Sequence, residues 1–223
     1  MENLITTFVS YLASFLAVLI VLPLHEFAHA FAADKCGDST PRLAGRYTLN
    51  PFAHFDPLGL VMLILLRFGW AKPVPVNPDN FKDYKKGCIW VSIAGVLTNI
   101  VLAILVCPLY MLSSKFVIGQ EWSTYIDLLI LGFFASMFYM NVGLFVFNLL
   151  PIYPLDGFRL YDALTKKRGK VYNFLRKNSF YLLIAIMLLS YVGDVTGIYW
   201  LDIIGFITGK ICRLIIRLWS FII

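Results

Sequence analysis

Long apolar runs alternate with short polar segments along this chain, a pattern typical of a membrane protein built from helices. Residues 4–24, 88–112 and 125–151 are each long enough to cross a bilayer, because a span needs about 18 or more apolar residues. Residues 4–24 also exceed the about 7–15 apolar residues of a signal peptide, so we expect them to remain as the first span. Together with shorter apolar segments, the pattern predicts an all-α polytopic protein with a bundle of about four to six membrane helices.

Three other segments predict additional elements. Residues 46–50 alternate between polar and apolar positions before a proline, which predicts a short membrane-associated β element. Residues 58–66 are strongly apolar but too few to span the bilayer, so we expect a re-entrant segment that is covered by protein. Residues 198–223 place their cations on one helical face, which suits either an interfacial helix or a tilted span.

The composition agrees with this class of protein. Of the 223 residues, 60% are hydrophobic and 14% are charged, whereas soluble domains average about 45–50% apolar and about 25% charged residues. The four cysteines are scattered without a Cys-x-x-Cys pair, so they indicate neither a disulfide framework nor a thiolate zinc site. We therefore expect a single membrane-embedded domain over residues 1–223.

The distribution of lysine and arginine predicts an orientation. Residues 33–87 hold eight of the 19 cations and residues 156–178 hold seven, while Lys115 lies in a separate loop. Because cations favour cytoplasmic loops, we expect both basic segments on the cytoplasmic side of the cell membrane and Lys115 on the opposite side. Contact of these loops with the anionic lipid bilayer accounts for the net charge of +6, so no nucleic-acid partner is expected.

A pair of histidines at the end of the first apolar run carries the strongest chemical signal. His25 and His29 are four residues apart on a helical segment, so both rings leave the same face and can bind one Zn²⁺. Glu26 is placed to take a proton from a water on that metal, as in the His-Glu-x-x-His arrangement of zinc peptidases. The alternative is a pair that packs within the bundle, or that binds haem or a transported metal. Ionisable residues near membrane depth are costly and usually functional, which favours catalytic zinc.

The histidine pair needs a third protein ligand, because catalytic zinc sites generally use three. The remaining candidates are His54, Asp56 and Asp156. Asp156 follows the 125–151 span, and the proline and glycine around it predict a turn that returns its carboxylate toward the membrane edge. His54 lies on the same predicted side, so spacing alone leaves both residues open. Asp56 precedes a proline, where a turn or the start of a helix is favoured.

Five separated segments carry a resemblance to a known family. They are HEFAHA at 25–30, GRYTLNPFAHFDPLG at 45–59, FGWAKPVPVNP at 68–78, AGVLTN at 94–99 and NLLPIYPLDG at 148–157. Together they resemble the site-2 protease family of intramembrane zinc metalloproteases, specifically its minimal prokaryotic members without a PDZ or CBS domain. The resemblance implies His25, His29 and Asp156 as ligands of one Zn²⁺ per chain, with Glu26 as the general base.

The same resemblance suggests roles for further polar residues. Asn148 matches a family asparagine beside the active site, where it would contact the substrate backbone or an oxyanion; a helix-packing hydrogen bond is the alternative. His54 matches a histidine outside the three ligands, which implies a supporting or loop-ordering role. Asn99 matches an asparagine that often follows Ala-Gly-Pro, although Val96 replaces the proline here. Asn50 belongs to the polar residues that we expect to line a hydrated cavity.

The expected function is hydrolysis of peptide bonds in or near the transmembrane segments of protein substrates, by zinc-activated water with Glu26 as general base. We expect a catalytic core in residues 1–160, C-terminal helices in residues 179–223, and an active site near the cytoplasmic face. The alternatives are a membrane metal-binding or transport protein and an inactive protease-like scaffold. The first has no need of Glu26, and the second has no need of the complete set with Asp156.

The charge distribution makes a prediction about topology. In a variant without native cysteines, single cysteines at positions 85 and 167 should react from the cytoplasmic side and one at position 115 from the opposite side. Labelling with a membrane-impermeant thiol reagent in intact cells and in inverted vesicles measures this. Labelling of positions 85 and 167 from different sides would contradict a re-entrant segment at residues 58–66.

Overall fold

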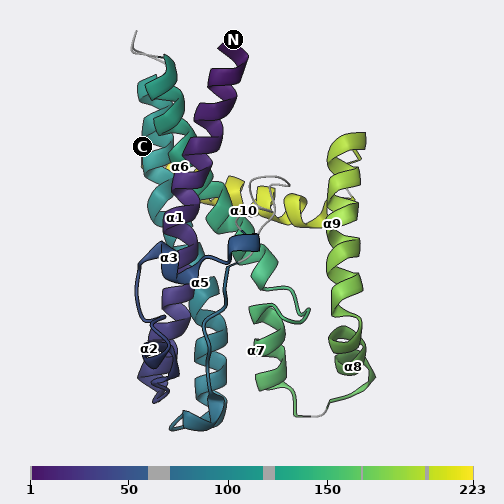
Figure 1. The fold of residues 1–223 in the computed structure, drawn as a ribbon. Coiled ribbons are helices and arrows are strands. Elements are labelled where there is room, and N and C mark those ends of the chain that lie inside the picture. Colours follow the sequence, from purple (N-terminus) through teal and green to yellow (C-terminus); the bar gives the residue numbers. More distant parts are fainter. Residues whose placement is uncertain (1, 60–70, 118–123, 167, 199–200, 223) are drawn as a thin grey trace.

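The computed structural model describes residues 2–59, 71–117, 124–166, 168–198 and 201–222, and these residues are mainly helical (Figure 1). The longer helices are α1 (Glu2–Cys36), α5 (Tyr84–Val117), α6 (Thr124–Asn148), α9 (Ser179–Thr196) and α10 (Ile203–Trp219). The shorter ones are α2 (Thr40–Leu43), α3 (Pro51–His54), the 3-10 helix η1 (Pro78–Asn80), α7 (Asp156–Leu164) and α8 (Lys170–Lys177). The all-α class expected from the apolar pattern is thus confirmed for this part of the chain.

Helices α1, α5 and α6 pack side by side and form the core of the fold (Figure 1). Over Leu4–Cys36, Tyr84–Phe116 and Tyr125–Asn148 they are long and apolar enough to cross a membrane. Only 22%, 39% and 28% of the residues in their most apolar windows are buried inside the protein. Most of their apolar surface therefore faces outward, as expected for helices surrounded by lipid.

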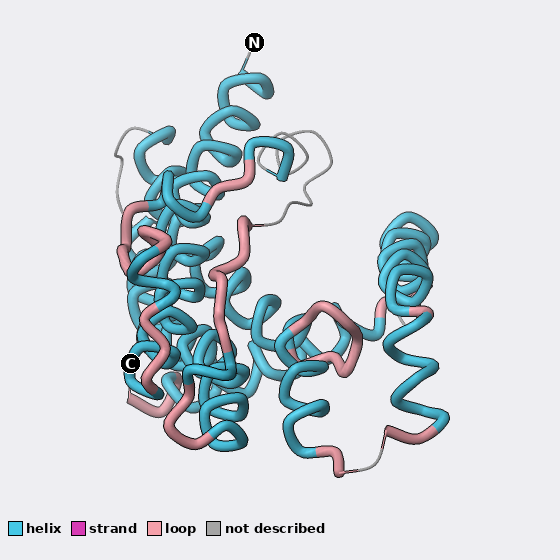
Figure 2. The backbone as a smooth tube through the Cα atoms, turned by 60° about the horizontal axis from the view of Figure 1, so that its bottom comes forward, coloured by secondary structure: helices cyan, strands magenta, loops and turns pink. Residues whose placement is uncertain are grey.

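The described residues contain three such helices, or four if α8 and α9, which are bent by 69° at their junction, form one broken span. The expected range of four to six spans is therefore reached only with the bent pair. Helix α9 stands apart from the three core helices in both views of the backbone (Figures 1 and 2). It packs mainly against α8 and α10.

Helix α10 crosses the long axes of the core helices instead of running along them (Figure 1). Its Cys212 and Ile215 are buried against the core, and the indole N–H of Trp219 donates a hydrogen bond of 2.9 Å to the carbonyl of Ile104. The interfacial helix and the tilted span both stay predictions for the C-terminal segment, because an orientation relative to other helices does not locate the membrane surface.

Small side chains bring α1 and α6 close together. Ala13 and Ala17 on α1 are fully buried, and a Cβ built on Gly132 of α6 would lie 3.1 Å from the Cβ of Ala13. The hydroxyls of Ser14 and Ser136 are 3.0 Å apart across the same interface. Lipid is as apolar as the helices themselves, so close packing and interhelical hydrogen bonds, more than burial of apolar surface, hold such a pair together.

Residues 46–50 do not form the strand that their alternation predicted, and the described chain contains no strand (Figure 2). The carbonyl of Thr48 instead accepts a hydrogen bond of 2.8 Å from the ring of His54. The side chain of Asn50 caps α3 by accepting a backbone N–H. The bond to His54 uses a backbone carbonyl that a strand would present to a neighbouring strand, and Pro51 has no N–H to offer.

An isolated antiparallel bridge joins Phe55 to Ala71. The N–H of Lys72 also donates to the carbonyl of His54 at 2.8 Å. The expected re-entrant segment at residues 58–66 lies mostly outside the described residues. The bridge nevertheless fixes where the chain re-enters the described part, and from there the chain runs along the second half of α1, from the contact of Val74 with Glu26 to that of Lys82 with Cys36.

Candidate metal centre

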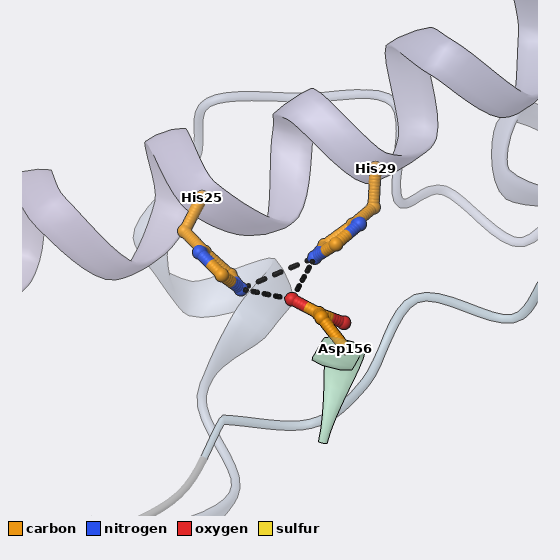
Figure 3. Close-up of side chains that lie close together, drawn as sticks. All are labelled: His25, His29 and Asp156. Carbon is orange, nitrogen blue, oxygen red and sulfur yellow. Dashed lines mark hydrogen bonds and ion pairs between the residues drawn. The ribbon is translucent and has the colours of Figure 1, made fainter. Parts of the chain in front are cut away.

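Three buried side chains converge between α1 and the start of α7 (Figure 3). His25 and His29 lie one turn apart on α1, and Asp156 is the first residue of α7. The two Nε2 atoms are 3.1 Å apart, and Asp156 Oδ2 lies 3.4 Å from that of His25 and 3.1 Å from that of His29. The three residues are 5%, 4% and 6% exposed. The structure therefore brings an aspartate from a distant part of the chain to the predicted histidine pair.

The spacing of these three atoms fits one zinc ion. Zinc binds imidazole nitrogen at about 2.0–2.1 Å and carboxylate oxygen at about 2.0–2.2 Å, so the edges of a zinc tetrahedron are about 3.3 Å long. The observed separations of 3.1, 3.1 and 3.4 Å are close to that value. Three protein ligands leave the fourth position of the tetrahedron open, which is typical of catalytic and not of structural zinc sites.

The hydrogen bonds of the two Nδ1 atoms leave a lone pair on each Nε2, and these lone pairs point toward the candidate metal position. His25 Nδ1 lies 2.6 Å from Oδ1 of Asn99, and His29 Nδ1 lies 2.7 Å from the carbonyl oxygen of Val91. Both oxygens only accept hydrogen bonds, so each Nδ1 carries the proton and each Nε2 presents a lone pair. Asp156 Oδ2 has no hydrogen-bond donor among the described residues. Three acceptors this close repel one another without a cation between them, so the donor set also fits zinc.

Two buried asparagines fix the orientation of the His25 ring. Asn99 on α5 donates to Oδ1 of Asn141 on α6 at 2.9 Å, and Asn141 donates to the carbonyl of Met137 at 2.8 Å. Because the amide nitrogen of Asn99 donates to Asn141, its Oδ1 is the atom that faces the imidazole of His25. Asn99 was expected near the site from the resemblance. Asn141 was not identified, and its one signal in the sequence is an amide inside an apolar span.

Gly95 allows α5 to approach the two histidines. A Cβ at this position would lie 2.4 Å from His29 Nε2 and 2.5 Å from His25 Cε1, distances at which atoms overlap. Because glycine has no Cβ, the backbone of α5 packs directly against both rings. Val91 and Asn99, the two partners of the histidine Nδ1 atoms, lie one helical turn before and after Gly95, on the same face of α5.

A tight turn after α6 returns Asp156 to α1. Backbone hydrogen bonds of 2.8 and 2.9 Å close this turn within residues 150–155. Gly157 then passes the end of α6 so closely that a Cβ would lie 2.3 Å from the carbonyl oxygen of Leu149, which explains the glycine after the aspartate.

Glu26 leaves α1 next to His25 but is not part of the ligand group. Its Oε2 accepts a hydrogen bond of 3.2 Å from the backbone N–H of Val74. Pro73 and Pro75 have no N–H, so Val74 is the one donor that the backbone offers at these three positions. Residues before proline favour extended backbone, and this short segment therefore presents a single N–H to the carboxylate.

Asp38 anchors the segment that carries Val74. Its buried carboxylate accepts hydrogen bonds of 2.8 Å from the N–H of Asn77 and from the side-chain amide of Asn80. Burial raises the pKa of Asp38, but the hydrogen bonds to its carboxylate lower this pKa by more, so the group stays ionised. These hydrogen bonds of Asp38 thereby connect the loop after α1 to residues 77–80, which follow Val74.

The other predicted polar residues lie outside the ligand group. His54 is fully buried, its Nε2–H donates to Thr48, and its Nδ1 has no partner among the described residues. Asn50 is exposed and caps α3. Asn148 is the partly buried last residue of α6. The structure thus places Asp156, and not His54, beside the histidine pair, while His54 makes a contact that orders its own loop.

The fold and the site define a class: a polytopic membrane protein whose apolar helices surround a metal site of two histidines and one aspartate. The sequence model of peptidase family M50 matches residues 13–191, and the chain belongs to this family, the site-2 protease family of zinc metalloproteases. Zinc is therefore the metal that the three side chains are suited to bind.

Relatives of known sequence carry names that agree with this family. The chain is 40% identical to "Putative zinc metalloprotease YwhC" of Bacillus subtilis over 153 residues, which cover 67% of each chain. It is 35% identical to "Putative zinc metalloprotease Rip2" of Mycolicibacterium smegmatis over 159 residues, covering 67% of this chain and 57% of the relative. A Mycobacterium tuberculosis protein of the same name is 26% identical over 214 residues, which cover 91% of this chain and 78% of the relative. No solved structure shows significant similarity to the chain.

The close approach of α5 predicts the effect of a single methyl group. Gly95→Ala should abolish zinc binding, because the new Cβ would displace both imidazoles. Elemental analysis of the purified protein should show a fall from about one zinc ion per chain to almost none. Gly143→Ala is the matched control on α6, where a Cβ meets no atom within 4 Å, and it should keep its zinc. Equal zinc content in the two variants would contradict the packing of α5 on the rings.

The geometry also predicts which residue completes the ligand set. Asp156→Asn should weaken zinc binding by at least about tenfold, because a neutral amide is a poorer ligand than a carboxylate. His54→Ala should keep its affinity, since His54 lies outside the group. Competition with a chelator measures both, on variants that elute as monodisperse, helical protein. Loss of zinc in His54→Ala with retention in Asp156→Asn would assign the third ligand to His54.

Proposed function

We propose that this protein hydrolyses peptide bonds in or near the transmembrane segments of membrane proteins, with Glu26 as its general base. The observation that carries the proposal is a carboxylate on α1 that directly follows His25 and stays outside the ligand group. A bound metal alone has no need of that second carboxylate. Membership of peptidase family M50 supports peptide hydrolysis as the reaction.

His25, His29 and Asp156 would hold the zinc ion. When bound, zinc would supply a Lewis acid that lowers the pKa of a water molecule toward about 7 and polarises the scissile carbonyl. Asn99 and the carbonyl of Val91 would keep both imidazoles in the tautomer and orientation that this requires. The apolar helices around the ligands would limit access of bulk water and strengthen each charge interaction.

Glu26 would accept a proton from the attacking water and deliver it to the leaving amine. Its Oε2 is hydrogen-bonded to the N–H of Val74, so Oε1 would be the atom that takes up the proton. The bond to Val74 also fixes the direction of the carboxylate. That matters because a general base acts only within about 2.6–3.2 Å of the proton that it abstracts, or through one water.

The substrate would be a protein helix within the same bilayer. His25 and His29 belong to the Leu4–Cys36 helix, which is apolar enough to span the membrane. The site would lie near the cytoplasmic face, because Val91 is seven residues, or about 10 Å, from the end of α5 that is flanked by a basic loop. A helical substrate would need local unwinding there, since its carbonyls are hydrogen-bonded within the helix.

Glu26→Gln separates this function from metal storage or transport. The variant should lose at least about a hundredfold in cleavage rate, because a general base contributes about 10²–10⁴-fold, while its zinc content stays at about one ion per chain. Cleavage of a model membrane substrate by purified protein in vesicles measures the rate. Asp34→Asn, the same change on the same helix outside the ligand group, should keep activity. Undiminished cleavage by Glu26→Gln would exclude the proposed base.

A further inference from the structure

A cavity of about 850 Å³ lies beside the metal centre and is bounded by the start of α5, the 71–78 segment, α7 and α8. Val74, Val91 and Phe158 form part of its apolar wall. Its cations come from three places: the start of α5, α7 with the loop that follows it, and α8. We call it the basic cavity; its charged lining residues are Lys85, Arg159, Asp162, Lys166, Arg168 and Arg176.

The lining of the basic cavity has a strong excess of positive charge, with five cations and one carboxylate. Arg168 forms an ion pair of 3.2 Å with Asp162, which neutralises one cation of the five. Within the part of the chain that the structure describes, the other four cations have no ion-pair partner. Cations that line one cavity raise the local positive potential and favour an anionic occupant.

The wall of the basic cavity is bonded directly to the catalytic groups. The N–H of Val74 donates to Glu26, and the carbonyl of Val91 accepts from His29. Phe158, in the same wall, is two residues after Asp156. A polypeptide whose scissile bond lies at the metal would therefore reach the basic cavity within a few residues, since extended chain advances about 3.3 Å per residue.

We propose that the basic cavity binds an acidic segment that flanks the cleaved transmembrane helix, so that Asp and Glu residues there select the substrate. This inference rests on the proposed proteolytic function. The apolar wall takes the side chains nearest the helix, and the cations pair with the carboxylates that follow. Charge complementarity at a site of this kind contributes mainly to discrimination between partners.

The proposed preference for an acidic flank is opposite to the charge that most membrane proteins carry there. Cytoplasmic flanks of transmembrane helices carry an excess of lysine and arginine. Such a flank would meet four unneutralised cations in the basic cavity and would be repelled, whereas an acidic flank would be attracted. The cavity thus discriminates against the abundant membrane proteins by repulsion as well as favouring its substrate by attraction.

An anionic lipid headgroup has the same charge as the proposed segment, but the position of the cavity favours the polypeptide. A lipid held against Val74 and Val91 would occupy the route from the metal to the cations. Occupation by lipid would then compete with substrate, whereas an acidic flank occupies the same space as part of the substrate itself. Phosphatidylglycerol is therefore the competing ligand that the experiment must separate.

The test measures binding by the full-length Glu26→Gln protein in phosphatidylcholine nanodiscs. The probes are three fluorescent peptides with one transmembrane helix and a cytoplasmic flank of four glutamates, four serines or four lysines. We expect the glutamate flank to bind about tenfold more tightly than serine and the lysine flank more weakly than serine. Adding Lys166→Glu and Arg176→Glu should remove the preference for glutamate and favour lysine.

The matched control replaces Lys170 and Lys177, which lie on α8 outside the cavity lining, by glutamate. It changes the net charge equally and should keep the preference for the glutamate flank. Equal binding of the glutamate and serine flanks would overturn the proposal, as would loss of the preference in the control pair. Binding of phosphatidylglycerol that depends on Lys166 and Arg176, without any flank preference, would assign the cavity to lipid and also overturn it.

A catalytic arm distinguishes this inference from the function on which it rests. The wild-type protein is given the same three helices, and cleavage is followed in phosphatidylcholine vesicles. Failure to cleave any of them, with the binding preference intact, would count against proteolysis and not against recognition of acidic flanks. Cleavage of all three at equal rates, with equal binding, would overturn the recognition and leave proteolysis in place.

Discussion

Three lone pairs that meet inside a bundle of apolar helices impose the constraint on which the rest of this structure depends. The Nε2 atoms of His25 and His29 and Oδ2 of Asp156 lie within 3.4 Å of one another in a buried site. Burying such a group without a cation costs free energy, because a buried carboxylate then lacks an opposite charge. Zinc binding and the packing of α1, α5 and α7 are therefore coupled, since the metal stabilises the arrangement that holds its ligands.

The metal ligands and Glu26 are held in place by different kinds of structure. Helix α5 supplies the acceptors for both imidazoles and the glycine that makes room for them, so the ligands are held by packed helices. Glu26 depends instead on the N–H of Val74, in a loop segment that Asp38 anchors. Loops open at a lower free energy than packed helices, so a disturbance of the 71–78 segment reaches the base before it reaches the metal.

The features that could be predicted from the sequence are those that short-range physics decides. In lipid a segment must satisfy its own backbone hydrogen bonds, so long apolar runs alone predict the three core helices. The four-residue spacing of His25 and His29 places their rings on one face of any helix. The alternation at residues 46–50 was a weaker guide, because it does not reveal that the ring of His54 binds the carbonyl of Thr48 or that Asn50 caps α3.

The core helices, the histidine pair and the place of Glu26 beside it could be predicted from the amino-acid sequence, because each follows from apolar length or from local backbone geometry. Spacing alone left Asp156 and His54 open, and the resemblance implied Asp156; the tertiary structure brings Asp156, and not His54, to the histidine pair. Asp156 lies 131 residues from His25, and the turn that returns it depends on the contact between Gly157 and the end of α6. Packing also brings Asn141 on α6 to Asn99 on α5, and it places cations from α5, from α7 with its following loop and from α8 around one cavity, although these residues are far apart along the chain.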